Sequence, residues 1–427
     1  MENIFNEWQW RGLLYDSTEE AEKALGSEKI VVYNGFDPTA DSLHVGSLIP
    51  MIGLARLQRY GHQPIALAGG GTGMIGDPSG RSTERNLLTT EEINHNVECI
   101  KEQLASLLDF EIKGNPALMV NNADWLAEIS MIEFLRDVGK HFSVNYMTSK
   151  DSVKSRLDRE SGGGLSFTEF TYMLLQAYDF HHLYKELGCT MQVGGSDQWG
   201  NITAGTTLVR KMDGATVHGA VYPLLTRADG SKFGKTAEGD SVWVDPKRTS
   251  PYRFYQFFLN TLDDDAQKML NFYTFLSQEE IAEYAQAIRD EPHKREAQKR
   301  LAAEVTRLVH GESGLAKATK ASDVFFGGDL DGLGAQEIED IFADVPSAKV
   351  GKDELSGEGV PLATLLADTG IAKSRGEARR LISNGGVYLN NVKADEADQA
   401  VTLAQSIDGQ FFVIRKGKKN YNLVKVE

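Results

Sequence analysis

The sequence contains little cysteine and no long apolar run, and both absences restrict what the chain can be. Its 427 residues include only two cysteines, Cys99 and Cys189, which are far apart and outside any metal-ligand spacing. We therefore expect neither a disulfide framework nor a zinc site, and a reducing, cytoplasmic location fits best. The sequence contains no run of about 18 apolar residues, so we expect no membrane span. The first residues carry acid and no basic segment, so we expect no signal peptide.

Positive charge is also scarce. The chain has 45 Lys and Arg against 61 Asp and Glu, a formal net charge of −16. Such an acidic chain is a poor default candidate for nucleic-acid binding. The deficit is uneven, however, because residues 360–427 carry 10 basic against 7 acidic residues and the remainder carries 35 against 54. An acidic body with a basic terminal region suggests that this region has its own partner.

The length predicts several domains rather than one core. Residues 29–36, 44–60 and 62–68 have the pattern of strand, helix and strand, followed by a glycine turn. This order indicates a βαβ unit and hence a parallel sheet. From about residue 251 helical patterns dominate. Residues 328–359 are rich in Gly, Asp and Glu, which predicts a loosely packed linker.

One candidate site is the segment His44–Ser47, called here the histidine turn, between a predicted strand and a predicted helix. Free backbone N–H groups and the helix dipole favour an anion at such a place. The His44 side chain can donate to a phosphate, and Gly46 lets a nucleotide approach the backbone. Alone the pattern is weak, because Asp41 or Ser42 could simply cap the helix.

A second candidate is the lysine loop, residues 228–236, in which Lys232 and Lys235 flank Gly234. A loop of this kind can close over phosphates. Taken alone, it is better interpreted as a solvated hairpin tip. Found together with the histidine turn, it favours a phosphate clamp.

The predicted helix 166–185 is apolar nearly all round, yet Tyr172, Gln176 and Asp179 share one face. A polar stripe on a buried helix predicts the wall of a polar pocket, because buried polar groups need partners.

Two glycine-containing turns add candidates. Asp197 could accept ribose hydroxyls or only cap a helix. Asp77 lies in a loop that lacks the Gly-Lys-Ser/Thr ending of a P-loop.

Together these segments resemble the bacterial tyrosyl-tRNA synthetases, which are class I enzymes. The histidine turn is similar to that family's HIGH-type motif, and the lysine loop is similar to the KFGKT form of its KMSKS loop. The resemblance covers almost the whole chain, including residues 134–146, 249–257 and 308–312. Residues 374–382 and 386–390 resemble an S4-type RNA-binding domain.

The resemblance implies an α/β fold class with a Rossmann-type parallel-sheet catalytic domain, an α-helical domain and a small C-terminal α+β S4-like RNA-binding domain. The expected bounds are 1–225 for the catalytic domain with a dimer-interface insertion, 226–327 for the KFGKT loop and the α-helical anticodon-binding domain, 328–359 for the linker and 360–427 for the S4-like domain.

It also implies a tyrosine–tRNA ligase that activates L-tyrosine with ATP to tyrosyl-adenylate and pyrophosphate, then transfers tyrosine to the 3′ end of tRNA(Tyr). ATP would enter with Mg²⁺, without a tightly bound protein metal site. The expected assembly is a cytoplasmic homodimer without a membrane partner. Three alternatives remain at this stage: a tryptophanyl enzyme, a small-molecule nucleotidyltransferase and a non-enzymatic RNA-binding relative.

Site roles follow from the resemblance, residue by residue. Tyr33 and Asp179 would bind the phenolic hydroxyl of tyrosine; Asp77, Tyr172 and Gln176 its ammonium group; and Gln198 would lie beside its carboxylate. ATP would contact Asp37, Gly46, Ser47, Gly195, Asp197 and Lys235. Catalytic roles fall on Thr39, His44, Lys232, Lys235 and Thr236, with Arg81 and Arg85 on a mobile loop. The residues expected to contact tRNA are Arg375, Arg379, Arg380, Arg415, Lys416, Lys418 and Lys419.

Three positions depart from common family patterns. Asn34 occupies a place where cysteine is frequent, Ser47 replaces the second histidine of the HIGH motif, and Arg81 replaces a lysine. None of these changes removes a group that the chemistry requires.

Overall fold

The computed structural model of the chain describes residues 3–79, 88–150, 153–154, 165–226, 233–234, 240–325, 327–330, 332–342, 345–417 and 420–427. The chain divides into two compact units. The first comprises Met1–Thr249 and Phe257–Val309, and the second comprises Ser250–Gln256 and His310–Glu427.

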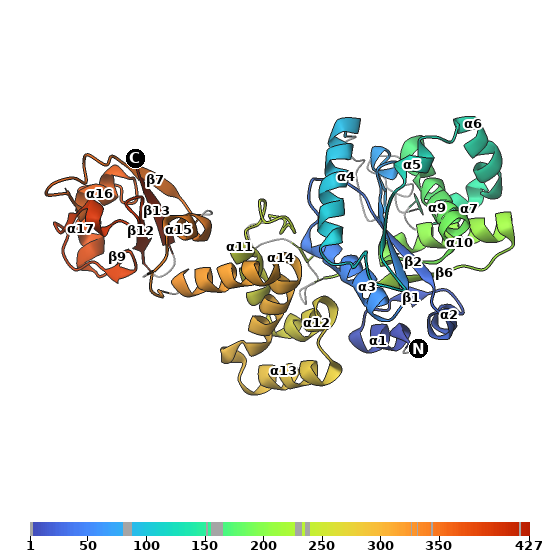
Figure 1. Ribbon diagram of the computed structural model, residues 1–427, viewed down its shortest axis with the longest axis horizontal. Helices are drawn as coiled ribbons and strands as arrows, with labels where there is room; N and C mark the ends of the chain where they lie inside the picture. The colour runs from blue at the N-terminus through green and yellow to red at the C-terminus, as the bar shows by residue number, and fades with distance from the viewer. Residues whose placement is uncertain are drawn as a thin grey trace. The chain divides into compact units, whose positions relative to one another are not determined.

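A six-stranded sheet forms the centre of the first unit, with the order β1-β6-β5-β2-β3-β4 (Figure 1). Neighbours from β6 to β4 pair in parallel, and only the short edge strand β1 is antiparallel. The predicted parallel sheet is therefore confirmed. The strands are β1 (Asp16–Ser17), β2 (Val31–Phe36), β3 (Gln63–Ala68), β4 (Leu118–Asn121), β5 (Cys189–Gly195) and β6 (His218–Tyr222).

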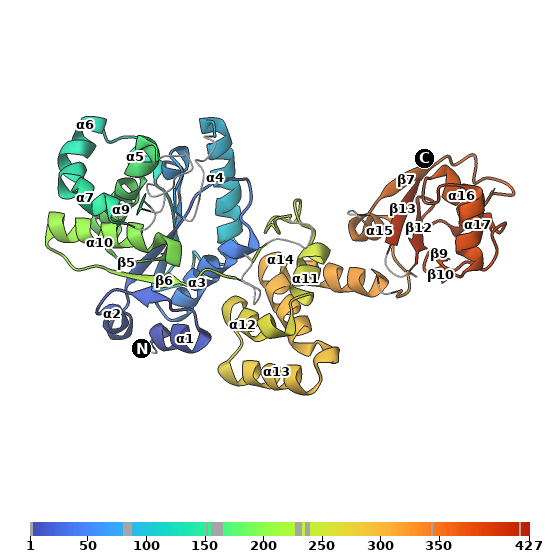
Figure 2. The ribbon, with the colours of Figure 1, turned by 180° about the vertical axis from the view of Figure 1, so that it is seen from behind.

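The strand order reverses at β2. The chain runs from β2 outward to β3 and β4, then returns to β5 on the other side of β2. Right-handed crossovers place the connecting helices on opposite faces. Figures 1 and 2 show α3 (Leu48–Arg59) and α4 (Thr90–Ala105) on one side, and α9 (Phe167–Leu187) and α10 (Trp199–Asp213) on the other. In such sheets ligands bind beside the carboxyl ends of the strands at the reversal, here β2 and β5.

Shorter elements complete this α/β region. A single turn is the next element after each of β2, β3 and β5, so these turns lie at the carboxyl edge of the sheet. These turns are η1 (Val45–Ser47), η2 (Thr72–Met74) and η5 (Ser196–Gln198). The other short elements are α1 (Ile4–Arg11), α2 (Ala21–Ser27), α5 (Ala123–Leu126), α6 (Met131–Glu133), the π-helical turn η3 (Phe134–Val138), η4 (Gly139–His141) and α7 (Val144–Thr148).

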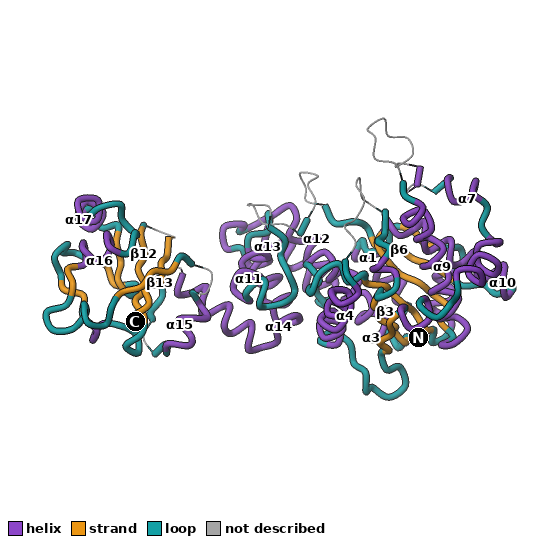
Figure 3. The backbone as a smooth tube through the Cα atoms, turned by 90° about the horizontal axis from the view of Figure 1, so that it is seen from above, coloured by secondary structure: helices purple, strands orange, loops and turns teal. Residues whose placement is uncertain are grey.

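The next part of the chain is helical, as its sequence pattern predicts. Figure 3 shows helices and loops but no strand among the described residues between β6 and β7. Gly311, with φ 70° and ψ −179°, interrupts the longest helix in a conformation that suits only glycine. The helices are α11 (Pro251–Leu259), α12 (Asp263–Tyr273), α13 (Gln278–Asp290), η6 (Pro292–Lys294) and α14 (Glu296–Phe325).

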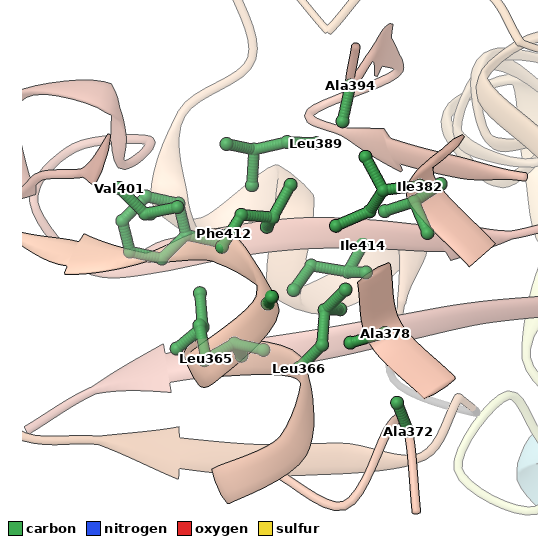
Figure 4. Packing of buried hydrophobic residues seen from close by; sticks show 14 of the residues in the cluster. Leu365, Leu366, Ala372, Ala378, Ile382, Leu389, Ala394, Val401, Phe412 and Ile414 are labelled. Atoms are coloured by element: carbon green, nitrogen blue, oxygen red, sulfur yellow. The ribbon is translucent and has the colours of Figure 1, made fainter. Parts of the chain in front are cut away.

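The second unit contains a five-stranded sheet of order β10-β9-β12-β13-β7 and a small pair, β8 with β11. Apolar side chains of α16 and α17 pack against β12, as Figure 4 shows for Leu366, Ile382, Phe412 and Ile414. The elements are β8 (Val360–Pro361), α16 (Leu362–Asp368), α17 (Arg375–Ser383), β9 (Val387–Leu389), β10 (Val392–Lys393), β11 (Ala400–Val401), η7 (Leu403–Gln405), β12 (Phe411–Lys416) and β13 (Asn420–Val426).

The prediction of a loosely packed linker over 328–359 is wrong for much of its length. Residues Ala335–Ile341 form α15, whose Ile338 is fully buried, and Ser347–Val350 form β7. Strand β7 pairs in parallel with β13, so it completes the terminal sheet. The segment lacks an apolar run, and its structure comes from a partner strand at the far end of the chain.

No helix in the described part of the chain has both the length and the apolar character that crossing a membrane requires.

Candidate active site

Tyr33, from the middle of β2, is the first of two buried residues expected to bind a phenolic hydroxyl. It is 1% exposed, and its hydroxyl has no hydrogen-bond partner among the residues described. Burial raises the pKa of the Tyr33 hydroxyl well above its usual value, and the nearby charge of Asp179 adds to the effect. The group is therefore a neutral, buried hydroxyl. Such a group is costly unless a ligand supplies its partner.

Asp179, on α9, is the second buried group of the pocket. Its Oδ2 accepts from Asn122 Nδ2 at 2.9 Å, and its Oδ1 accepts from Trp125 Nε1 at 2.8 Å. Burial raises the pKa of Asp179 to about 7, although the two donors lower it. The carboxyl group therefore changes its charge near neutral pH. No sequence pattern indicates Asn122 and Trp125, which lie in the segment that follows β4 at the carboxyl edge of the sheet.

A polar network connects this end of the pocket to the end expected to bind an ammonium group. Asn122 Nδ2 also donates to Thr72 Oγ1 at 2.9 Å. Thr72 Oγ1 donates to Asp37 Oδ1 at 2.9 Å, and Tyr172 Oη donates to Asp37 Oδ2 at 2.9 Å. The predicted polar stripe of α9 therefore contacts the loop after β2. Gln176, one turn beyond Tyr172 on the same helix, is half-buried.

Asp77 and Gln198 meet across the strand reversal. Gln198 Nε2 donates to Asp77 Oδ2 at 2.6 Å, and the Ser79 N–H donates to Asp77 Oδ1 at 2.9 Å. Asn201 Nδ2 in turn donates to Gln198 Oε1 at 3.1 Å. The structure therefore brings together two residues that are 121 positions apart in the sequence, both expected near the amino-acid substrate.

The histidine turn has one defined tautomer. His44 is exposed, and its Nδ1 accepts from the Gly46 N–H at 3.0 Å. The neutral ring therefore carries its proton on Nε2, where it can donate to a phosphate. The ring lies across Gly46, since a Cβ there would come within 2.7 Å of His44 Cε1. Ser47, the next residue, is half-buried and begins α3 without a side-chain cap bond.

The strand-like segment after the lysine loop holds the histidine turn from the other side. The Val45 N–H donates to the Val242 carbonyl at 3.0 Å, and the Val244 N–H donates to the Leu43 carbonyl at 2.8 Å. His44 and Trp243 thus form an antiparallel bridge. These bonds connect the histidine turn directly to the residues that follow the lysine loop.

Two further predicted nucleotide contacts lie at the carboxyl ends of the reversal strands. Thr39 is exposed, and its N–H donates to the Asp37 carbonyl at 2.9 Å. Gly195 ends β5, where a Cβ would lie 2.5 Å from Asp197 Oδ1. A side chain at this position would displace the Asp197 carboxylate, so the glycine allows its half-buried position.

Several predicted residues lie outside the described part of the chain. These are Arg81, Arg85, Lys232, Lys235 and Thr236 near the expected phosphate site, and Lys418 and Lys419 in the terminal unit. Phe233 and Gly234 of the lysine loop are described. Phe233 is buried against Phe257 and Tyr273, at ring-centroid distances of 5.0 and 6.0 Å.

The basic residues of the second unit fall into two groups. Arg375, Arg379 and Arg380 are exposed on α17, and Arg379 pairs with Asp398 at 2.8 Å. Arg415 and Lys416 are half-buried and engaged within the unit. The Arg415 guanidinium lies 3.6 Å from the centroid of the Tyr388 ring, and Lys416 Nζ donates to the Ile371 carbonyl at 3.2 Å.

Comparisons with known proteins agree over the full length. A family model described as "tRNA synthetases class I (W and Y)" matches residues 26–327, and one for the "Tyrosine--tRNA ligase SYY-like C-terminal domain" matches residues 337–424. The tyrosine–tRNA ligase of Roseiflexus castenholzii is 54% identical over 426 residues, covering 100% of both chains. That of Opitutus terrae is 52% identical and covers 99% of both chains.

A solved structure is also similar to this chain. The C-terminally truncated mitochondrial tyrosyl-tRNA synthetase of Aspergillus nidulans aligns with a TM-score of 0.69 and 30% identity, covering 76% of this chain and 95% of that one.

Proposed function

The chain belongs to the tyrosine–tRNA ligases, class I aminoacyl-tRNA synthetases, and we propose that its pocket binds the phenol of L-tyrosine between Tyr33 and Asp179. The tyrosine-specific terminal model and the full-length relatives exclude the tryptophanyl alternative. The enzyme joins tyrosine to tRNA at the expense of ATP. The proposal therefore concerns which residues perform each part of this reaction.

The observation that carries the proposal is the unpartnered Tyr33 hydroxyl beside the fully buried Asp179. A phenol can accept from Tyr33 while donating to the ionised carboxylate of Asp179. Phenylalanine would leave both groups without a partner. A site built in this way rejects the analogue that lacks the hydroxyl; the handling of tyrosine against phenylalanine by this family is the established example of that principle.

The remaining roles follow from the positions of the polar groups. Asp77, Tyr172 and Gln176 would receive the ammonium group, and Gln198 would lie beside the carboxylate. ATP would bind at the carboxyl ends of β2 and β5, through Asp37, Gly46, Ser47, Gly195, Asp197 and Lys235. The side chains of Asp37, Asp77 and Asp179 already accept hydrogen bonds from the protein, which fits Mg²⁺ entering as part of the ATP substrate.

The chemistry needs alignment more than proton transfer. The tyrosine carboxylate is already a nucleophile when it attacks the α-phosphorus, and the α–β phosphoanhydride bond breaks as pyrophosphate leaves. Rate then depends on donors aimed at the charge that develops on the phosphates. His44 Nε2 would supply one such donor. Thr39, Lys232, Lys235, Thr236, Arg81 and Arg85 would supply the others. A ribose hydroxyl of tRNA then attacks the adenylate carbonyl, and AMP leaves.

Other features remain part of the proposal. We place the tRNA on the helical region and on the exposed arginines of α17, and we add Lys418 and Lys419, which follow Lys416 in the sequence. We also propose the domain bounds implied by the resemblance, with α15 and β7 now assigned to the terminal domain. Met131, Ile132, Leu135 and Val144 are exposed apolar side chains, 43–71% accessible, within one short segment. Such a group is typical of an interface, here that of a cytoplasmic homodimer.

Titration calorimetry with tyrosine, phenylalanine and tyramine tests the assignment of the pocket. We expect phenylalanine to bind more weakly than tyrosine by orders of magnitude in the wild-type protein, and the difference to shrink in Tyr33→Phe. Tyramine should bind more weakly than tyrosine only by the part of the binding free energy that the tyrosine carboxylate contributes. An unchanged preference for tyrosine in both Tyr33→Phe and Asp179→Ala would contradict the proposed position of the phenol.

A further inference from the structure

Tyr273 is the last residue of α12, in the helical region. It contacts both the histidine turn and the lysine loop. Its hydroxyl donates to the Val45 carbonyl of the histidine turn at 3.0 Å. Its ring packs against Phe233 of the lysine loop, with centroids 6.0 Å apart, and against Phe258 at 5.3 Å. Tyr273 is fully buried, and burial raises the pKa of its hydroxyl, so the group remains a donor at every pH of interest.

The bond to Val45 acts on the turn that presents His44. The Val45 N–H is held by Val242 at 3.0 Å, so both polar backbone groups of Val45 are bound from outside the turn. His44 precedes this fixed residue, and its ring is bonded to Gly46, which follows it. The direction in which His44 Nε2 points therefore depends on the Val45 peptide plane.

The end of α12 is itself held rigidly on the α/β region. Arg56, fully buried on α3, donates to the Phe272 carbonyl at 3.1 Å and to the Thr274 carbonyl at 2.5 Å. Arg11 donates to the Leu276 carbonyl at 2.6 Å, and Glu7 accepts from Arg11 at 2.5 Å. Cations at the C-terminal end of a helix satisfy its last carbonyls and favour its dipole. This anchoring gives the Tyr273 hydroxyl a fixed position.

We propose that Tyr273 is a positioning residue for tyrosine activation, which holds the histidine turn through Val45 and supports Phe233 of the lysine loop. The inference rests on the proposed role of His44 as a phosphate donor. The sequence does not reveal it, because the pattern of α12 shows Tyr273 only as one of several residues on an apolar face.

The test is the single-turnover rate of pyrophosphate release at saturating tyrosine and ATP, measured for Tyr273→Phe. This variant keeps the ring against Phe233 and removes only the hydroxyl. We expect the rate to fall about tenfold, which is less than the roughly hundredfold loss that a 1 Å displacement of a catalytic group can cause, while the dissociation constant for tyrosine alone stays within about twofold. An unchanged rate overturns the proposal.

A double variant separates positioning from general destabilisation. If Tyr273 acts through the histidine turn, the hydroxyl deletion should change the rate by less than about twofold in the His44→Ala background. Equal losses in both backgrounds overturn the proposal.

Tyr421→Phe is the matched control, because the Tyr421 hydroxyl also donates to a backbone carbonyl, that of Val324 at 2.9 Å, in the other unit. It should lower the unfolding midpoint without lowering the rate; an equal loss of rate in this control overturns the proposal. A wild-type protein without tyrosine-dependent pyrophosphate release would instead contradict the proposed function itself.

Discussion

The indole nitrogen of Trp125 lies 2.8 Å from Oδ1 of Asp179 and donates a hydrogen bond to it. Together with Asn122, this donor stabilises the ionised form of a carboxyl group that burial would otherwise keep neutral. The balance holds the pKa of Asp179 at about 7. Asp179 is the residue proposed to recognise the phenol. Its charge therefore depends on Asn122 and Trp125, two side chains that are not themselves proposed to contact the substrate.

Tyrosine binding should depend on pH because ionised Asp179 accepts from the phenol much more strongly than the neutral acid does. With a pKa of about 7, we expect the dissociation constant of tyrosine to rise about tenfold from pH 8 to pH 6. Above pH 8 the affinity should level off until the substrate's own amino group titrates. Calorimetry across this range measures the effect, and a flat profile would contradict the assignment.

Replacement of Trp125 should move this profile in a known direction. Trp125→Phe removes a donor that lowers the pKa of Asp179. The phenylalanine ring can still stack on His182, whose ring centroid lies 4.3 Å from that of Trp125 in the wild-type protein. The midpoint should therefore shift to higher pH. A shift to lower pH would show that the hydrogen bond favours the neutral acid instead.

Arg56 should contribute strongly to stability. Arg56→Met leaves the carbonyls of Phe272 and Thr274 without their buried side-chain donor, and it leaves Glu7 with one cation fewer. We expect a loss of about 3 kcal/mol in the free energy of unfolding, typical of breaking a buried ionic group. Denaturant titration measures it. The exposed Arg289, replaced by Ala as a control, should cost less than about 0.5 kcal/mol.

Truncation should be tolerated at one boundary and not at another. A chain that ends at residue 327 removes α15, β7 and the strand β13 that pairs with β7, and it should keep adenylate formation within about twofold while losing tRNA charging. A chain that ends at 359 retains β7 without β13, which leaves an unpaired strand edge and favours aggregation. Full charging by the shorter chain would show that the terminal domain is dispensable.

The proposed dimer can be tested with one charge. Ile132, 71% exposed, lies in the apolar segment proposed as the interface. Ile132→Glu should shift sedimentation from dimer toward monomer, because an unpaired carboxylate is costly inside an interface. Leu262→Glu, at a similarly exposed leucine in the helical region, should leave the assembly unchanged. Dimers that resist the Ile132 change would place the interface elsewhere.

The sequence predicts the central strands and helices of the first unit well, because each of them carries a recognisable pattern within its own segment. The apolar runs of β2 and β3 flank a helical pattern, a glycine run follows β3, and the polar stripe of α9 stands out on an apolar helix. Strand β1 has only two residues, and β7 has no apolar run, so neither carries a local signal. Both exist because a distant strand offers free backbone groups.

The sequence indicates a candidate site residue where a side chain belongs to a distinctive chemical pattern. Tyr172 and Asp179 could be found because they share a face of one helix. Asn122, Trp125 and Tyr273 were missed, because their importance comes from contacts across the fold, at sequence separations of 54 for Trp125–Asp179 and 228 for Tyr273–Val45. A pattern in one segment cannot show such contacts.

The most direct test of the whole account is the exchange of labelled pyrophosphate into ATP with each of the twenty amino acids in turn. For the wild-type protein we predict exchange with tyrosine alone. Exchange with phenylalanine should rise above background only when Tyr33 or Asp179 is replaced. Equal exchange with phenylalanine and tyrosine in the wild-type protein would contradict the proposed recognition of the phenol by these two residues.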